Sequence, residues 1–394
     1  MFFITMLWLF IIILIIILLK LLNIKKNYLI CFFITLIIVL FFINMETSIS
    51  AALEGASLVV KAILPTIFPF TVICNILIGF DGISLYSKIM GPLFCKPLGL
   101  SKNCSFPIAA SFLSGYPLGA KYSSDLYNMG YIDKTEYQRL LNIASNAGPV
   151  FLIGSIGTAM LLNPIYGYIL LIANYLSIII VGFLTKKKKS NSNLSQLNSP
   201  SYKEKNFGII LKESIEQGIS TTLNVSAFVI IFSIIISIIK DNAYINIAFN
   251  NFELLFNFPK DSIYSLFLGS IEFTNGCKLI SNSILPIHIK LSMISFICSF
   301  SGLSIIAQVS SFISKDNISM IKYTLLKLLQ GILSFIITFV SSKFLLTSVP
   351  TSSIINNDSI FNNIYVFILP ILIILLLTLC LKTIYYIMRK LHVS

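Results

Sequence analysis

Residues 105–121 read SFPIAASFLSGYPLGAK, an apolar stretch that is interrupted by residues that break helices. Two prolines and two glycines fall within it, namely Pro107, Gly115, Pro117 and Gly119. Non-helical backbone is tolerated at membrane depth only where protein or a water-filled cavity covers it. Basic residues flank the stretch on both sides, so we expect Ser105–Ala120 to form a re-entrant helical hairpin that enters and leaves on the cytoplasmic face.

The chain around this stretch is too apolar for a water-soluble fold. Of its 394 residues, 56% are hydrophobic and 11% are charged, and the mean hydropathy is +0.91. A membrane-spanning helix needs about 20 mainly apolar residues, and the clearest candidates are Phe2–Leu22, Tyr28–Asn44, Tyr166–Leu184, Ser220–Ile239 and Ile364–Ile387. The first lacks a basic start and a small-residue cleavage site, so we interpret it as a retained helix. We predict an all-α fold, a polytopic transmembrane helix bundle.

The basic residues orient the chain, because cytoplasmic loops carry an excess of Lys and Arg. Lys186–Lys189 is the strongest such signal, and placing it inside gives nine expected spans, among them Gly55–Gly79 and Leu140–Leu162, with Asp241–Asp261 as an outside loop. The expected regions are N-terminal transmembrane helices at 1–50, a first repeat at 51–186, a cytoplasmic linker at 187–207, a second repeat at 208–346 and a C-terminal transmembrane helix at 347–394.

Several function classes find no support in the residue types. The seven cysteines show no Cys-x-x-Cys spacing and the histidines are His288 and His392, so we expect neither a metal site nor a cofactor. The net charge of +13 lies in loops between spans, which predicts no nucleic-acid binding. No Ser-His-Asp set, paired-carboxylate soluble cleft or phosphate-binding loop is evident, so we expect no catalytic residues and no enzyme.

The two halves of the chain carry similar motifs in the same order. Gly119-Ala-Lys121 matches Gly276-Cys-Lys278 in a second broken stretch, Ile263–Ile280, and Ser145-Asn-Ala-Gly148 matches Ser299-Phe-Ser-Gly302. The loop charges place the first unit with its start outside and the second with its start inside, which predicts inverted repeats. Such repeats with interrupted helices are typical of secondary transporters. A single glycine is more often a packing contact, but the paired occurrence favours a transporter.

At four motifs the chain resembles a known family. They are Leu113-Ser-Gly-Tyr-Pro-Leu-Gly-Ala-Lys121, Asn146-Ala-Gly-Pro-Val-Phe-Leu-Ile-Gly154, Gly269-Ser-Ile-Glu-Phe-Thr-Asn-Gly276 and Phe300-Ser-Gly-Leu-Ser-Ile-Ile-Ala-Gln-Val309. Here the chain resembles the sporulation integral membrane proteins of the YlbJ type, which carry two nucleoside-recognition Gate domains. The resemblance implies a multi-pass cell-membrane transporter, placed in the mother-cell-derived outer forespore membrane, that moves dipicolinate towards the forespore. The Gate fold is also similar to that of concentrative nucleoside transporters.

Ionisable side chains at membrane depth are functional candidates, because inserting one costs at least about 2.5 to 3.5 kcal/mol. Lys121 and Lys278, with N–H groups at helix N-termini, are expected partners of a dianionic solute. Glu272 either pairs with Lys278 or binds a coupling proton, and a sodium ion is the other coupling ion considered. The alternative for each lysine is snorkelling to the membrane interface.

Uncharged polar residues in the interrupted segments either coordinate a small-molecule solute or satisfy free backbone groups. The candidates are Asn142, Asn146, Thr274, Asn275, Ser301, Ser304 and Gln308, and the expected hairpin glycines are Gly115, Gly119, Gly148, Gly276 and Gly302. Three functions stay open: a transporter of an aromatic dicarboxylate, an ion-coupled nucleoside transporter, and a non-transporting sporulation membrane scaffold. Cations at the site favour the first, an amide and hydroxyl lining favours the second, and polar hairpins disfavour the third.

Overall fold

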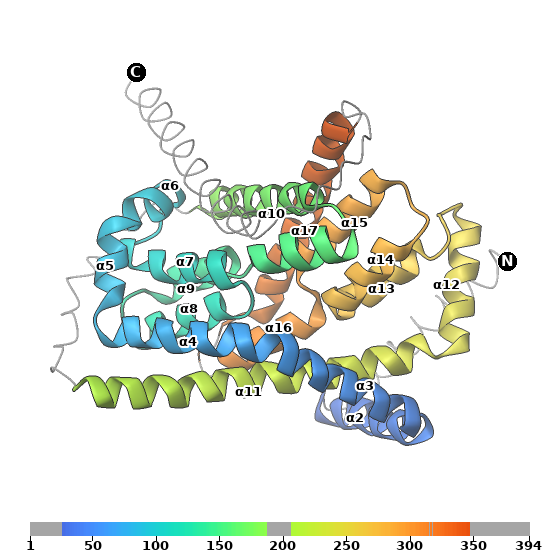
Figure 1. The fold of residues 1–394 in the computed structure, drawn as a ribbon, viewed down its shortest axis with the longest axis horizontal. Helices are drawn as coiled ribbons and strands as arrows, with labels where there is room; N and C mark the ends of the chain where they lie inside the picture. Colours follow the sequence, from blue (N-terminus) through green and yellow to red (C-terminus); the bar gives the residue numbers. More distant parts are fainter. Residues whose placement is uncertain (1–25, 187–205, 315, 317, 347–394) are drawn as a thin grey trace, which may run out of the picture.

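A computed structural model describes residues 26–186, 206–314, 316 and 318–346 (Figure 1). Every regular element in these ranges is a helix, so the predicted all-α fold class is confirmed. The expected spans Phe2–Leu22 and Ile364–Ile387 lie outside the described residues, and so does nearly all of the expected linker.

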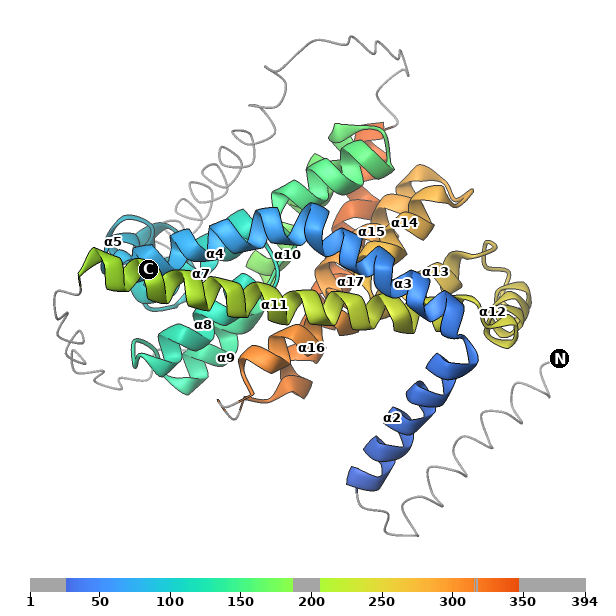
Figure 2. The same ribbon diagram turned by 60° about the horizontal axis from the view of Figure 1, so that its bottom comes forward.

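A long pair of helices forms one side of the molecule. α3 (Met45–Leu58) continues through the π-helical turn η1 (Val59–Ile63) into α4 (Leu64–Gly79), and α11 (Phe207–Lys240) runs beside them in both views (Figures 1 and 2). Glycines permit the close approach. A Cβ added to Gly55 would lie 3.0 Å from the Ser233 Oγ, and one added to Gly218 would lie 2.7 Å from the Val72 Cγ2.

The expected span Gly55–Gly79 lies within a longer helical stretch. Its helix begins at Met45, and sharp bends mark both ends: Asn27–Ile43 meets Met45–Lys61 at 100°, and Leu64–Gly79 meets Gly82–Ile89 at 90°. These elements are α2 (Lys26–Ile43) and α5 (Gly82–Ile89). The short turns η2 (Gly91–Cys95), α6 (Lys96–Leu98) and η3 (Lys102–Cys104) lead to the first hairpin.

Both predicted helical hairpins are present. α7 (Ser105–Ser114) and α8 (Leu118–Asn128) form the first, and α13 (Ser262–Ile271) and α14 (Phe273–Asn282) form the second. The first extends beyond the predicted end at Ala120. Its second arm, LGAKYSSDLYN, is too polar to be recognised by hydropathy, but most of its residues are buried inside the protein. In both views the hairpins lie on opposite sides of α17 (Met320–Leu346) (Figures 1 and 2).

A broken helical segment follows each hairpin. α9 (Lys134–Ile143) and η4 (Val150–Met160) are separated by non-helical residues around Asn146, so the expected span Leu140–Leu162 is not one continuous helix. α15 (Ile287–Phe300) and α16 (Gly302–Phe312) are separated at Ser301, whose φ is +77°. A long helix completes each series, α10 (Pro164–Leu184) in the first half and α17 in the second. The same order of elements therefore recurs, while the inverted orientation of the repeats stays a prediction.

Within the described ranges, four helical stretches are long and apolar enough to cross a bilayer, or up to six if each sharply bent pair forms one span. The four are Pro164–Leu184, Phe207–Lys240, Ile287–Phe312 and Met320–Phe344. The expected outside loop Asp241–Asp261 is also largely helical, because it contains α12 (Ala243–Leu255). Its buried Glu253 accepts hydrogen bonds from the first backbone N–H groups of α13, which fixes the start of the second hairpin.

Candidate functional site

The turn of each hairpin packs against the helix break in the same half of the chain, that is, between α9 and η4 or between α15 and α16. A Cβ added to Gly115, at the first turn, would lie 2.5 Å from the backbone nitrogen of Gly148 in the first break. In the second half, a Cβ added to Gly302 would lie 3.2 Å from the Gly269 carbonyl oxygen. Gly115 and Gly302 also have positive φ angles of +84° and +73°, which favour glycine. Both positions therefore require glycine for close approach and for conformation.

Two more of the predicted glycines, Gly119 and Gly276, let a hairpin arm pack directly against neighbouring backbone. A Cβ added to Gly119 would lie 1.8 Å from the carbonyl oxygen of Ala144, and one added to Gly276 would lie 2.1 Å from the Cα of Gly269. Neither backbone atom can move aside like a flexible side chain. The five predicted glycines thus lie in the packing of hairpin arms and breaks.

The turns of the two hairpins also meet each other. The ring centroids of Tyr116, in the first turn, and Phe273, directly after the second, are 6.0 Å apart. Phe151, from η4, lies 4.9 Å from Phe273 on the same measure. The Tyr116 hydroxyl donates a 2.6 Å hydrogen bond to the backbone carbonyl of Cys298. The first hairpin therefore contacts both the second hairpin and the second broken segment.

Buried amide groups near the breaks have unused acceptors. Asn146 is fully buried and donates to the Ile143 carbonyl at 2.7 Å and to the Ser111 Oγ at 3.2 Å. Asn174, from α10, donates to the Ser299 Oγ at 3.0 Å. The Oδ1 atoms of both asparagines are buried and receive no hydrogen bond from the protein. Since buried polar groups are normally satisfied, these oxygens are available to donors on a solute or on water.

Sequence reasoning missed Lys327, a fully buried lysine in α17. Its ammonium donates to the Gln330 Oε1 at 2.7 Å and to the backbone carbonyl of Ser145 in the first break. The same Nζ lies 5.5 Å from the ring centroid of Tyr116. No Asp or Glu of the described chain lies within 4.0 Å of it. An ionisable residue inside the long apolar stretch that forms α17 was the signal that could have identified it.

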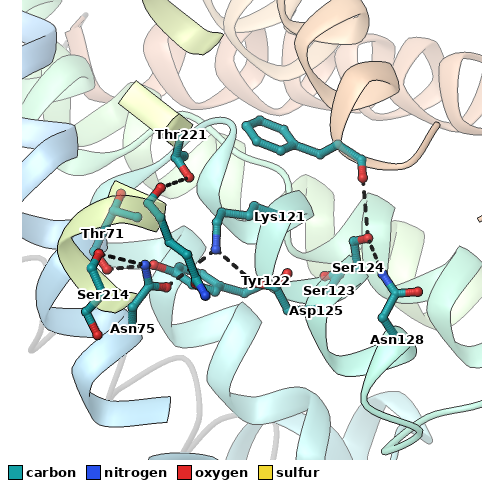
Figure 3. A network of polar contacts seen from close by, with 12 residues as sticks. Thr71, Asn75, Lys121, Tyr122, Ser123, Ser124, Asp125, Asn128, Ser214 and Thr221 are labelled. Atoms are coloured by element: carbon teal, nitrogen blue, oxygen red, sulfur yellow. Dashed lines mark hydrogen bonds and ion pairs between the residues drawn. The ribbon is translucent and has the colours of Figure 1, made fainter. Parts of the chain in front are cut away.

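Lys121 lies in a separate polar network that Figure 3 shows from close by. Its ammonium is 2.8 Å from the Asp125 carboxylate and 3.4 Å from the Asn75 Oδ1. Asn75 in turn donates to the Ser214 carbonyl of α11 at 3.4 Å. Lys121 is only 8% exposed, so its side chain points into the protein rather than along the outer surface.

A cavity of about 870 Å³ with both polar and apolar lining adjoins this network between α4, α8, α11 and α16. Its polar lining includes Asn75, Lys121, Asp125, Gln217, Thr221 and Asn224. One cation, Lys121, two carboxylates, Asp125 and Glu213, and several amides and hydroxyls thus face a space large enough for a small polar molecule with its water.

The residues of the second hairpin are arranged differently from the prediction. Glu272 is the N-cap of α14, and its carboxylate accepts hydrogen bonds from the backbone N–H groups of Thr274 at 3.0 Å and Asn275 at 2.8 Å. Lys278 is exposed, and the structure forms no ion pair between it and Glu272. Of the two alternatives for Glu272, the pairing with Lys278 is therefore wrong, because the carboxylate instead satisfies the helix N-terminus.

The remaining predicted polar residues lie in the second broken segment and at the end of α9. Ser301 is fully buried in the break, and the buried Gln308 donates to the Ser304 Oγ at 3.4 Å while its Oε1 receives no hydrogen bond. Asn142 is buried with its Oδ1 likewise unpaired. Within the described residues, no group of three His, Cys, Asp or Glu side chains could hold a metal ion.

The chain is similar to known proteins. Residues 60–143, which include the first hairpin, match the Gate family model, described as nucleoside recognition. The chain is 26% identical over 325 residues to the sporulation integral membrane protein YlbJ of Bacillus subtilis (strain 168), across 77% of this chain and 79% of that protein. A solved structure of a CNTnw variant in an outward-facing state aligns with a TM-score of 0.47 and 18% identity, across 72% of this chain and 76% of that one. The resemblance to YlbJ-type membrane proteins that carry a Gate domain is thus confirmed.

Proposed function

We propose that this protein is a membrane transporter that binds a small anionic solute where the turns of two hairpins meet two broken helices. The observation that carries the proposal is the contact of Tyr116 with Phe273, each beside a helix break. Interrupted helices in secondary transporters turn free backbone groups and helix ends towards the solute. A scaffold protein has no need of buried, unsatisfied amides such as those of Asn146 and Asn174 at these breaks.

The charge of Lys327 supports an anionic solute. The Lys121 ammonium is balanced by Asp125 at 2.8 Å, whereas Lys327 has no such partner among the described residues. A buried, unpaired charge is strongly unfavourable. An anion about 6 Å away would recover about 3 kcal/mol at an effective dielectric constant of 20. A negatively charged solute therefore stabilises the occupied site more than a neutral solute does.

The resemblance to YlbJ-type proteins makes dipicolinate, a flat aromatic dicarboxylate, the first solute to test. In this proposal it moves from the mother cell towards the forespore across the outer forespore membrane. The aromatic rings of Tyr116, Phe151 and Phe273 provide surfaces against which such a ring can pack. Asn146 and Ser301 are proposed contacts at the breaks, and Thr274, Asn275 and Gln308 are further proposed contacts. Lys121 is proposed as a cationic contact in the separate cavity beside α8.

A nucleoside is the second candidate, because the Gate model that matches residues 60–143 is described as nucleoside recognition. Amide groups such as those of Asn146 and Asn174 can form hydrogen bonds with a nucleoside. A neutral nucleoside, however, does not offset the charge of Lys327.

The experiment is uptake into proteoliposomes that contain the purified full chain, with labelled dipicolinate and labelled nucleosides measured in parallel. We expect saturable dipicolinate uptake that excess unlabelled dipicolinate suppresses and excess nucleoside does not. Nucleoside uptake alone would favour the second candidate. If neither solute exceeded its level in protein-free liposomes, the transport proposal for both solutes would be contradicted.

A further inference from the structure

We infer that Lys327 is a built-in cation of the solute site and occupies the position that a coupling sodium ion would otherwise take beside the first helix break. The inference rests on the proposed function and adds its ion dependence: solute binding and transport do not require sodium. In transporters with interrupted helices, unwound backbone carbonyls and the C-terminal ends of half-helices coordinate the coupling cation. The protein places its own ammonium group at such a carbonyl.

The surroundings of the ammonium match those of a cation site. Ser145 follows the C-terminal end of α9, where the helix dipole is negative, and its carbonyl accepts a hydrogen bond from Lys327. The Gln330 Oε1 accepts another at 2.7 Å, and the ring of Tyr116 lies at 5.5 Å. Two oxygens and an aromatic face therefore surround a group with three hydrogens to donate.

The lysine is also held firmly between the two halves of the chain. Tyr323, one helical turn before Lys327 in α17, forms a 2.7 Å hydrogen bond between its hydroxyl and the Ser145 Oγ. α17 is a second-half helix, whereas Ser145 and Tyr116 belong to the break and hairpin of the first half. The cation thus joins the elements that form the proposed solute site.

Gln330 provides a second, independent indication of an anionic ligand. Its side chain is 1% exposed, and while its Oε1 accepts from Lys327, its Nε2 has no acceptor in the protein. This buried amide donor lies beside a buried ammonium group and needs an acceptor atom that the protein does not supply. A carboxylate oxygen of the solute meets this requirement and offsets the charge of Lys327.

A mobile sodium ion is not needed at this position. It would compete with the ammonium for the Ser145 carbonyl, and two cations within a few ångströms repel each other strongly in a low-dielectric interior. With Lys327 in place, the cationic group that favours anion binding is therefore supplied by the protein itself.

The first test is the ion dependence of the wild-type chain. Dipicolinate uptake into proteoliposomes is measured in sodium chloride and in choline chloride of equal ionic strength. We expect rates within twofold of each other. Uptake that falls more than tenfold in choline would overturn the inference and leave the proposed transport intact, whereas the absence of uptake in both salts would contradict the proposed function itself.

Substitutions then test the residue. In choline chloride we expect Lys327→Met, which keeps much of the volume and removes the charge, to reduce uptake at least tenfold. The matched control is Lys322→Ala on the same helix, because Lys322 is exposed and should leave uptake within twofold of wild type. Wild-type uptake by Lys327→Met would overturn the inference.

Chemical rescue separates the role of the charge from a role in folding. Lys327→Ala removes three methylene groups and the ammonium, which together correspond to propylammonium. We expect added propylammonium to restore part of the uptake in a saturable way, while propanol at the same concentration does not. If the Ala and Met variants fail to insert into the membrane, Lys327→Arg is measured instead. Uptake by this variant that does not depend on sodium supports the inference, and sodium-dependent uptake contradicts it.

Discussion

The hydroxyl of Tyr116 donates a 2.6 Å hydrogen bond to the backbone carbonyl of Cys298, which lies 182 residues later in the chain. This bond joins the turn of the first hairpin to the last helical turn before the second break. Tyr116 therefore connects two segments that the proposed transport requires to act together.

Replacing this tyrosine with phenylalanine isolates the hydrogen bond. Tyr116→Phe keeps the ring contact with Phe273 but leaves the Cys298 carbonyl without its donor. An unsatisfied buried acceptor costs about 1 to 3 kcal/mol, so we expect a lower melting temperature in detergent and slower uptake at normal abundance. An unchanged melting temperature would show that the bond contributes little to stability.

Two glycines in the first half provide a matched pair for testing the hairpin packing. Gly119→Ala would place its Cβ 1.8 Å from the Ala144 carbonyl oxygen, whereas Gly154→Ala meets nothing within 4 Å. Overpacking against backbone is among the most destabilising kinds of substitution and costs about 1 to 3 kcal/mol or more. We expect Gly119→Ala to lower the amount of folded protein in membranes severalfold and Gly154→Ala to leave it near wild type. Equal amounts of the two variants would contradict the described seating of α8.

The second hairpin allows a double-mutant cycle. Because Glu272 caps α14 and forms no ion pair with Lys278, Glu272→Gln and Lys278→Met should act independently on stability. We expect Glu272→Gln to cost about 1 kcal/mol as a weakened N-cap and the coupling between the two changes to be below about 0.5 kcal/mol. A larger coupling, measured by denaturant unfolding, would indicate that the two charges interact after all. Dipicolinate uptake by Lys278→Met tests separately whether this exposed lysine contacts the solute.

Lys121 and Asp125 form an ion pair whose structural and transport roles can be separated. Lys121→Met leaves Asp125 without its cation, and we expect a loss of stability that the double variant with Asp125→Asn largely restores. If Lys121 contacts the solute, uptake stays low in the stable double variant. Uptake that returned together with stability would assign the lysine a purely structural role.

Sequence reasoning located the two hairpins, because residues such as Gly115 and Pro117 interrupt otherwise apolar segments. It did not recognise the second arm of the first hairpin, since the polar side chains of α8 are buried by protein rather than exposed to lipid. Asn146 was expected to lie in an interrupted segment, but hydropathy did not show how far the break extends, because the neighbours of Asn146 are apolar enough to resemble a continuous span.

The contacts between the two halves of the chain could not be predicted from the sequence. Lys327 was visible as a charge in an apolar helix, but its approach to Ser145 and Tyr116 depends on how α17 packs against the first half. Likewise, Glu272 and Lys278 are close in sequence, yet the carboxylate turns to the N-terminus of its own helix. Tertiary packing, rather than spacing along the chain, decided both outcomes.

The central claim, that an anionic solute binds where the hairpin turns meet the helix breaks, is tested most directly by dipicolinate uptake with wild type and Asn146→Asp. The substitution keeps the shape of the side chain and introduces a negative charge at the first break, in a fully buried position. For protein reconstituted at equal amounts, we predict saturable uptake by wild type and at least tenfold slower uptake by Asn146→Asp. Equal uptake by the two proteins would contradict the proposed location of the site.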